Sequence, residues 1–207
     1  MNSSATPIFA IRRHRIEIDG PGIRTLVGFY GCPLQCKYCI NPQCKDLDKS
    51  ILWTPKRLFE FIKMDDLYFQ ATNGGVTFGG GEPGLNYVFI KEFRDICNPN
   101  WSIAIETTLN YSKKVLDVLI DCVDFFIIDI KDLSKDVYKS YTSKDNVLVV
   151  ENLKYIARLQ LQKKCCIKTP HIPNYNSEYQ IETSILKLKQ MGFDNIETFD
   201  YITNYHG

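Results

Sequence analysis

Short apolar runs alternate with longer amphipathic segments along most of the chain. Six of the short runs are rich in β-branched and aromatic residues and almost continuously apolar, which is typical of parallel strands covered on both faces. Strands and helical segments in alternation indicate βα units around one parallel sheet. The predicted strands are Thr25–Tyr30, Gly75–Phe78, Ser102–Glu106, Phe125–Ile130, Cys165–Thr169 and Asn195–Phe199.

The amphipathic segments predict helices between these strands. Thr54 and Pro55 fit an N-cap followed by proline at the first helical position, and Gly192 fits the end of the last helix. A closed barrel of eight βα units takes about 250 residues, so six units indicate an incomplete one. The sequence therefore predicts an α/β fold, a partial (β/α)6 barrel. The predicted helices run from Pro55 to about Asp66 and over Tyr87–Cys97, Ser112–Asp121, Val149–Gln162 and Glu178–Met191, with a short one at Ser134–Tyr141.

The composition is that of an ordinary globular protein. Of 207 residues, 44% are hydrophobic and 24% are charged, and this length suits one domain over residues 1–207. The formal net charge of +1 gives no electrostatic reason to expect nucleic acid or an anionic membrane. No apolar run approaches the roughly 20 residues of a membrane span, and the N-terminus lacks a signal-peptide pattern. We therefore expect a cytoplasmic protein with neither nucleic acid nor a membrane as partner.

Four of the eight cysteines lie between Cys32 and Cys44. In a chain without an export signal, this clustering indicates metal ligation rather than disulfides. Cys32, Cys36 and Cys39 have CxxxCxxC spacing directly after the first predicted strand, at the end where barrel enzymes carry their chemistry. Three thiolates can hold three irons of a cubane cluster and leave the fourth iron open. A four-thiolate zinc site that includes Cys44 is the alternative.

A glycine-rich turn follows the second predicted strand. Gly79, Gly80 and Gly81 precede Glu82 and Pro83, and the missing side chains let the backbone approach a ligand closely. Taken alone, such a turn is more often a plain tight turn than a binding site. Its predicted position facing the cysteine loop favours a role in binding a polar cofactor.

The two motifs together resemble the radical S-adenosylmethionine superfamily. The run Ile18–Arg24, with the sequence IDGPGIR, is similar to the activating enzymes of glycyl radical enzymes, of the pyruvate formate-lyase type. The resemblance covers most of the chain. It extends to Glu106-Thr107 after the third predicted strand, Asp129-Ile130-Lys131 after the fourth and Lys168–Pro173 after the fifth.

This resemblance implies the radical S-adenosylmethionine form of the partial barrel and its chemistry. Cys32, Cys36 and Cys39 would ligate one [4Fe-4S] cluster, and S-adenosylmethionine would bind the open iron. One-electron cleavage would give methionine and a 5′-deoxyadenosyl radical that abstracts hydrogen. The implied substrate is a backbone glycine of a glycyl radical enzyme, and the alternative is a small molecule or short peptide. The implied electron donor is a flavodoxin or a ferredoxin-like protein.

The resemblance also assigns cofactor and substrate contacts. Gly80, Gly81 and Glu82 would accept the methionyl amine, and Lys168 would lie near the methionyl carboxylate. Asp19 would orient the substrate backbone. Each of three residues also has a simpler alternative role. Lys168 can be a solvated lysine at a strand end, Asp129 can cap the next turn, and Asp19 can serve only the turn. The full set of implied cofactor contacts is Tyr38, Asn41, Gly80, Gly81, Glu82, Glu106, Thr107, Asp129, Lys131 and Lys168, and a monovalent cation would lie beside Glu106, Thr107 and Asp129.

Several positions depart from the activating-enzyme pattern. Gly79 stands where Ser or Thr is usual, Ile40 replaces a His or Trp, Leu109 replaces a glycine, and Glu106 is longer than the usual Asp. The chain also ends soon after the sixth strand, so we expect a domain truncated at its C-terminal end relative to larger relatives. No cysteine-rich insert separates Cys44 from the glycine turn, which predicts a single cluster.

Overall fold

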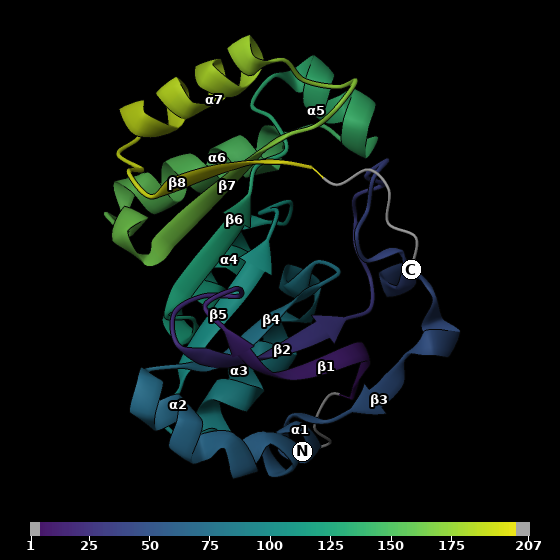
Figure 1. Cartoon of the computed structure of the whole chain (residues 1–207), viewed down its shortest axis with the longest axis vertical. Coiled ribbons are helices and arrows are strands. Elements are labelled where there is room, and N and C mark those ends of the chain that lie inside the picture. Colours follow the sequence, from purple (N-terminus) through teal and green to yellow (C-terminus); the bar gives the residue numbers. More distant parts are fainter. Residues whose placement is uncertain (1–4, 202–207) are drawn as a thin grey trace.

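A curved sheet of eight strands forms the centre of the computed structural model, which describes residues 5–201 (Figure 1). The strand order is β3-β1-β2-β4-β5-β6-β7-β8, and neighbouring strands are parallel from β2 to β8. β1 pairs antiparallel with both β2 and β3. The strands are β1 Thr6–Ile16, β2 Ile23–Phe29, β3 Ile51–Trp53, β4 Gly75–Gly80, β5 Ser102–Thr107, β6 Phe125–Asp129, β7 Cys165–His171 and β8 Ile196–Asp200.

The six predicted strands are confirmed as the parallel part of this sheet, with ends that differ by at most two residues. The α/β partial-barrel class is likewise confirmed. β1 and β3 were not predicted. β1 is irregular, with register shifts against β2 and a left-handed backbone at His14 (φ 58°), and its second half exposes polar side chains. Neither an apolar run nor a clean alternation therefore marks it in the sequence.

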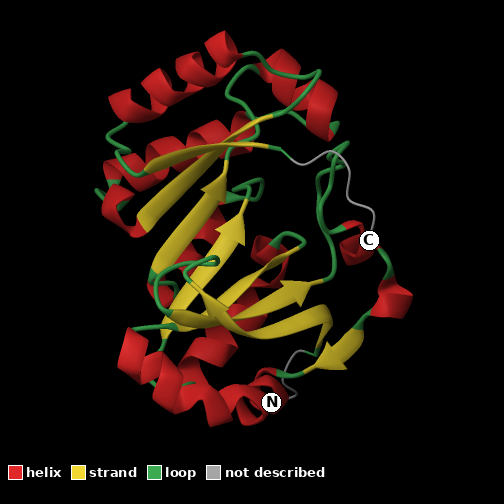
Figure 2. Cartoon of the chain, viewed as in Figure 1, coloured by secondary structure: helices red, strands yellow, loops and turns green. Residues whose placement is uncertain are grey.

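Helices cover the sheet and surround its strands (Figure 2). α1, α2 and α3 lie near the end formed by β1 and β2, and α6 and α7 lie near β7 and β8 (Figure 1). Within residues 5–201, no helix has the length and apolar character needed to cross a bilayer. The helices are α1 Pro55–Ile62, α2 Asp66–Thr72, α3 Tyr87–Ile96, α4 Lys113–Cys122, α5 Lys135–Thr142, α6 Val147–Arg158 and α7 Glu178–Gln190, with short 3-10 turns at η1 Pro42–Lys45, η2 Leu47–Lys49, η3 Lys63–Asp65, η4 Pro83–Asn86 and η5 Gln162–Lys164.

The predicted signals at Thr54 and Gly192 are confirmed, but the end of the first helix is not where it was expected. Thr54 caps α1 by accepting a hydrogen bond from the backbone N–H of Arg57 at 3.2 Å, and Gly192 has φ 85° after α7. The predicted single helix from Pro55 to about Asp66 is wrong: α1 ends at Ile62, and η3 separates it from α2. The carboxylate of Asp65 in η3 accepts from Arg13 Nε of β1 at 2.7 Å, a contact between segments far apart in sequence.

Aromatic side chains fill the core between the sheet and α3. The ring of Phe78 on β4 stacks on Phe29 of β2 with centroids 5.3 Å apart, and it meets Phe93 of α3 edge-on at 5.4 Å. All three side chains are fully buried. Burying a phenylalanine contributes about 1.5 to 3 kcal/mol, so these contacts hold the ends of β2 and β4 rigidly in place. The two motif loops leave the sheet from those ends.

Candidate active site

The cysteine loop follows β2 and lies across the carboxyl end of the sheet. Its backbone is tied to α5, because the N–H of Gln35 donates to the carbonyl of Thr142 at 2.9 Å and that of Lys37 to Tyr141 at 3.2 Å. Its start is tied to the returning segment, because the N–H of Gly31 donates to the carbonyl of Cys44 at 2.7 Å. Both ends of the loop are therefore anchored to the protein.

A cavity of about 300 Å³ opens beside this loop, at the carboxyl ends of β4 to β8. Ligand pockets in proteins begin at about this size. Most of the predicted cofactor contacts are brought together here, including the three motif cysteines. The lining residues are Cys32, Leu34, Cys36, Cys39, Ile40, Asn41, Gly80, Gly81, Glu106, Thr107, Thr108, Ile127, Asp129, Lys131, Lys168, Phe199, Asp200 and Tyr201.

The three motif cysteines are half-buried free thiols on the wall of this cavity. Burial raises the pKa of the Cys32 thiol to about 12 and that of Cys36 to about 11. The pKa of Cys39 is lowered instead, because the thiol of Cys44 donates a hydrogen bond to its sulfur. Within residues 5–201, no three His, Cys, Asp or Glu side chains converge as ligands of one metal ion. A cubane cluster spreads its ligands over different irons, and cysteines along a cavity wall suit that requirement.

The glycine turn packs directly against the cysteine loop. The N–H of Gly81 donates to the carbonyl of Phe29 at 2.9 Å, and Asn41 Nδ2 donates to the carbonyl of Gly80 at 3.3 Å. Gly80 has φ 84°, and a Cβ at Gly81 would lie 2.1 Å from the carbonyl oxygen of Gly31. Only glycine permits this close approach of the two backbones. The turn is therefore part of the cavity wall rather than an isolated surface turn.

The Glu82 side chain does not face the cavity, contrary to the expected contact with the methionyl amine. Its carboxylate is fully buried and accepts from Thr107 Oγ1 at 2.6 Å, from Thr108 Oγ1 at 2.7 Å and N at 2.9 Å, and from the N–H of Gly84 at 3.1 Å. Burial raises the pKa of Glu82, and the hydrogen bonds from Thr107 and Thr108 oppose that increase. The carboxylate ties the glycine turn to the end of β5 and leaves no oxygen for a ligand.

Tyr38 also lies outside the cavity lining. Its ring meets Tyr175 edge-on with centroids 5.7 Å apart and lies 6.1 Å from Tyr141, and Asn174 Nδ2 donates to its hydroxyl at 3.4 Å. The cofactor contact of Tyr38 therefore stays a prediction. Its ring and hydroxyl anchor the cysteine loop to the segment that follows β7 and to α5.

Asp129 ends β6 beside Lys131, and the two side chains form an ion pair. Burial lowers the pKa of Lys131, but the charge of Asp129, the charge of Cys36 and the hydrogen bond to Asp129 together outweigh this, and the pKa is raised overall. The other carboxylate oxygen of Asp129, Oδ1, is buried and has no hydrogen-bond partner among the described residues. No capping contact of Asp129 is found among the described residues, since Oδ2 accepts from Lys131 and Oδ1 has no partner. Asp129 therefore presents an acceptor that a bound ligand can satisfy.

Glu106 and Lys168 face each other across the cavity from β5 and β7. Glu106 Oε1 lies 3.9 Å from Lys168 Nζ. Burial raises the pKa of Glu106 to about 7, and the nearby ammonium of Lys168 limits the increase. Lys168 is therefore not simply a solvated lysine at the end of a strand.

Replacing Glu106 by glutamine is expected to change how stability depends on pH. The pKa of this carboxyl group is near 7 in the folded protein and about 4.3 in the unfolded chain. Its contribution to the free energy of unfolding is therefore full below about pH 4.3 and is lost as pH rises through 7. Glutamine does not titrate, so Glu106→Gln removes this dependence of stability on pH. Urea midpoints of anaerobic, cluster-loaded protein at pH 6 and pH 8.5 should differ less in the variant than in the parent, and an unchanged difference would contradict the assignment.

Asp19 lies in the IDGPGIR loop, outside the main cavity. Its carboxylate is buried and accepts from Arg15 Nε at 2.7 Å and Nη2 at 3.1 Å. The loop lines a second cavity of about 320 Å³, which shares Ile127 and Lys168 with the first. Asp19 therefore lines neither cavity, and its carboxylate is held by Arg15.

Arg24, at the end of the same run, was not singled out from the sequence as a site residue. Its guanidinium is completely buried and donates to Thr77 Oγ1 at 2.6 Å and to the carbonyl of Val76 at 2.8 Å, and burial lowers its pKa to about 10. Thr77 Oγ1 in turn donates to the carbonyl of Asp19 at 2.7 Å. Arg24 thus fixes the loop to β4. Only its place in the IDGPGIR motif signalled this role.

Comparisons with known proteins agree with this geometry. A family model described as the Radical SAM superfamily matches residues 26–186. The 4-hydroxyphenylacetate decarboxylase activating enzyme of Clostridioides difficile (strain 630) is 28% identical, over 82% of this chain and 73% of its own length. The pyruvate formate-lyase-activating enzyme of Clostridium pasteurianum is 34% identical, over 69% of this chain and 64% of its own length. Streptococcus suis SuiB bound to precursor peptide SuiA has a TM-score of 0.65 at 16% identity, over 84% of this chain and 38% of its own, and shows the fold.

The cavity residues fit the cofactors that this superfamily implies, a [4Fe-4S] cluster and S-adenosylmethionine. Three thiols line one cavity, and the glycine turn exposes its backbone groups because it has no side chains there. Asp129 Oδ1 is buried and has no hydrogen-bond partner among the described residues. The family match covers well over half of the chain and includes the cysteine loop, the glycine turn and the ends of β4 to β7. This chain therefore belongs to the radical S-adenosylmethionine superfamily, as its motifs predicted.

Proposed function

We propose that this chain activates a glycyl radical enzyme by abstracting hydrogen from one of its backbone glycines. The observation that carries the proposal is the shared cavity of the three cysteines, the glycine turn and the charged ends of β5 to β7. Curated relatives that cover most of this chain are named as activating enzymes. The IDGPGIR loop beside the cavity adds a second element of the activating-enzyme pattern.

In this proposal Cys32, Cys36 and Cys39 ligate the cluster. The cluster and S-adenosylmethionine, when bound, supply a 5′-deoxyadenosyl radical by one-electron cleavage. The backbone of Gly80 and Gly81 receives the methionyl amine, and Lys168 attracts the methionyl carboxylate. Only the backbone of Glu82 is available for a ligand, because its side chain is satisfied within the protein.

The remaining polar residues of the cavity hold the nucleoside and balance charge. Asp129 Oδ1 accepts a hydrogen bond from a ligand hydroxyl, and Asn41 keeps Gly80 in place. A monovalent cation beside Glu106, Thr107 and Asp129 belongs to the proposal. Lys131 already balances the charge of Asp129, so Glu106 is the carboxylate that such a cation would neutralise.

The electron donor in this proposal is a flavodoxin or a ferredoxin-like protein, and the enzyme works in the cytoplasm. Reductive cleavage needs a low-potential one-electron donor, and such carriers are soluble proteins of the reducing cytoplasm. The half-buried cysteines lie in an anchored loop at the surface of the sheet, from which a docked donor can reach them.

Asp19 is proposed to orient the backbone of the substrate protein, and Asp19→Asn is expected to weaken that contact. A hydrogen bond to a charged group contributes about 1.5 to 3 kcal/mol, so kcat/KM for the partner enzyme should fall by about 10-fold to 150-fold. Cleavage of S-adenosylmethionine without the partner should stay near the parent level, because Asp19 does not line the cofactor cavity.

Arg15→Gln is the matched control for Asp19→Asn. It breaks the same ion pair with Asp19 but keeps the carboxylate. We expect it to retain more of kcat/KM than Asp19→Asn. An equal loss in both variants would assign Asp19 a purely structural role.

The proposed function is tested by anaerobic reconstitution with iron and sulfide, followed by incubation with a reductant, S-adenosylmethionine and a candidate glycyl radical enzyme. The expected result is a doublet electron spin resonance signal on the partner together with 5′-deoxyadenosine. Cleavage without that signal for any glycyl radical enzyme of the source genome would reject activation. It would favour the alternative, a small molecule or short peptide as substrate, for which the cavity has an adequate size.

A further inference from the structure

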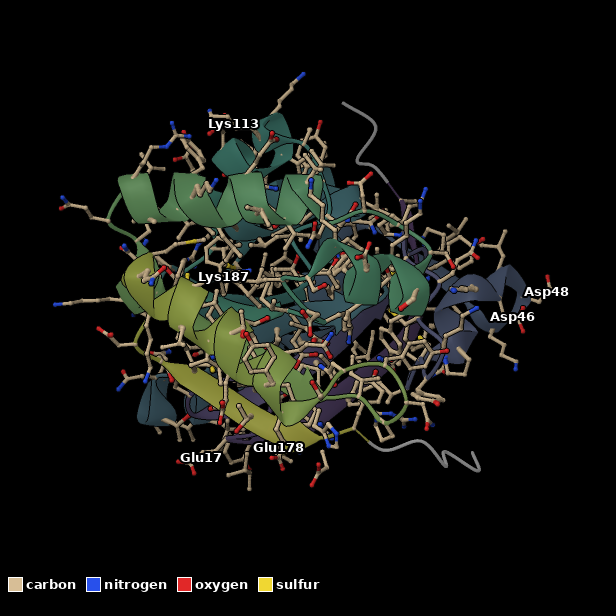
Figure 3. All side chains as sticks on the ribbon, turned by 90° about the horizontal axis from the view of Figure 1, so that it is seen from above. Glu17, Asp46, Asp48, Lys113, Glu178 and Lys187 are labelled. Atoms are coloured by element: carbon tan, nitrogen blue, oxygen red, sulfur yellow. The ribbon has the colours of Figure 1, made fainter. Side chains whose placement is uncertain are left out.

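β8 forms one edge of the eight-stranded sheet, and its outer side has no neighbouring strand among residues 5–201. Of its five residues, the four from Glu197 to Asp200 are exposed. Figure 3 shows Glu17, which precedes the IDGPGIR loop, on the same side of the molecule as this strand. The strand at the opposite edge, β3, is only three residues long. β8 is therefore the longer of the two edge strands.

The register between β7 and β8 determines which backbone groups of β8 face the open edge. Just before β8, the carbonyl of Asn195 accepts from the N–H of Ile167 at 2.9 Å. Just after it, the N–H of Tyr201 donates to the carbonyl of His171 at 2.8 Å. Backbone groups point to alternate sides along a strand, so residues 197 and 199 also bond to β7. The residues whose N–H and C=O groups face the open edge are therefore Ile196, Thr198 and Asp200.

β8 borders both cavities of the molecule. Phe199 lines the cofactor cavity and is 42% exposed, and Glu197 lines the second cavity beside the IDGPGIR loop. These two side chains are two residues apart, so they lie on the same face of the sheet. Lys168 of the neighbouring strand lines both cavities. A segment paired with the open edge of β8 would therefore pass the second cavity and the cofactor cavity in turn.

Hydrogen abstraction from a glycine requires the enzyme to position a backbone atom, because glycine has no side chain that a pocket could hold. Addition of a strand to a sheet edge meets this requirement. Hydrogen bonds between the main chains fix the register of the added segment, and its alternate side chains enter pockets. In an added strand, every second residue would face the two cavities. At a glycine in such a position, a hydrogen occupies the place of Cβ and points toward the cofactor cavity.

We propose that the open edge of β8 binds the substrate segment of the glycyl radical enzyme as an added β-strand, with the target glycine level with Phe199. The inference rests on the proposed function and adds the conformation in which the substrate is bound. Main-chain hydrogen bonds to Thr198 hold the segment in register. The side chain two residues from the glycine, level with Glu197, enters the second cavity of about 320 Å³.

Thr198→Pro tests the added strand in the reconstituted holoenzyme. The N–H of Thr198 points away from β7, so proline removes a donor that only an added strand would use, and proline is tolerated at such edge positions. Thr198→Val is the matched control, since it keeps the N–H and nearly the same shape. We expect kcat/KM for the partner enzyme to fall about tenfold in Thr198→Pro, through the lost hydrogen bond and the bulk of the ring, and to stay near the parent value in Thr198→Val. Cleavage of S-adenosylmethionine without the partner should be unchanged in both variants, because Thr198 does not line the cofactor cavity.

Hydrogen–deuterium exchange gives a second measurement that needs no variant. In the parent holoenzyme loaded with S-adenosylmethionine, the amides of Ile196, Thr198 and Asp200 should exchange rapidly and should slow by about tenfold or more when the partner enzyme binds. Exchange in β3, at the opposite edge of the sheet, should stay the same. This measurement decides if Thr198→Pro fails to fold.

Three results would each overturn the added strand. They are slow exchange of these β8 amides in the free enzyme, exchange that a partner acquiring the radical leaves unchanged, and equal kcat/KM in Thr198→Pro and Thr198→Val. The parent enzyme separates this failure from that of the proposed function. Radical formation on the partner without protection of β8 rejects only the added strand, whereas the absence of a radical on every candidate partner rejects the proposed function.

Discussion

Replacing Cys36 by alanine is expected to abolish assembly of the four-iron cluster and, with it, cleavage of S-adenosylmethionine. Two thiolates cannot hold three irons of a cubane, and the only cysteines on the cavity wall are Cys32, Cys36 and Cys39 among residues 5–201. Cys44 is buried outside the lining of the cavity, so we expect it not to replace Cys36. Iron and sulfide content, visible absorbance and 5′-deoxyadenosine formation should all fall to background.

Two further variants separate ligation from packing. Cys36 contacts the aromatic cluster around Tyr141, so alanine also removes a small amount of packing. Cys36→Ser keeps nearly the same size and is expected to lose the cluster as well. Cys122→Ala makes the same chemical change at a buried thiol of α4 and should keep it. A full complement of iron and product in Cys36→Ala would contradict the ligand assignment.

The parallel part of the fold was predictable because its signals are local. Buried strands such as Phe125–Asp129 are apolar up to their last residue, and caps such as Thr54 lie within three residues of the N–H that they satisfy. The break between α1 and α2 has a distant cause. Asp65 is held by Arg13 at 2.7 Å and by His14 at 2.9 Å, both from β1. β1, one of the two unpredicted strands, thus contacts the segment that divides the predicted helix.

The composition of the cavity was largely predictable from the motifs, but the directions of individual side chains were not. The spacing of the three cysteines placed their thiols on one wall, because the loop begins at a strand end. Glu82 and Tyr38 stand in the same motifs and turn away, since their partners are Thr107, Thr108 and Tyr175, which come from other segments. A motif specifies which residues gather at a site, whereas the surrounding fold decides which of their atoms face the ligand.

The buried carboxylate of Glu82 gives rise to the second large expected effect, in Glu82→Ala. The substitution leaves the hydroxyls of Thr107 and Thr108 and the N–H groups of Thr108 and Gly84 without their acceptor. Unsatisfied buried donors cost about 1 to 3 kcal/mol each before relaxation, so the free energy of unfolding should fall by about 2 to 4 kcal/mol. Urea unfolding of the reconstituted protein under anaerobic conditions measures this loss.

The same substitution should weaken S-adenosylmethionine binding, although the side chain does not reach the cavity. Glu82 joins the glycine turn to the end of β5, and both segments line the cavity. A loss of about 1.4 kcal/mol in the free energy of binding would raise Kd for S-adenosylmethionine about tenfold, which equilibrium titration can detect.

Two further variants serve as controls. Glu82→Gln keeps the shape of the side chain but turns an NH2 group toward donors, so we expect stability and affinity between those of the parent and Glu82→Ala. Glu60→Ala on α1, which removes an exposed carboxylate paired with Lys63 of η3, should change stability by less than about 1 kcal/mol and leave binding intact. If Glu82→Ala bound the cofactor as tightly as the parent, the turn would hold its shape without this carboxylate, through its hydrogen bonds with Phe29 of β2 and with Asn41 of the cysteine loop.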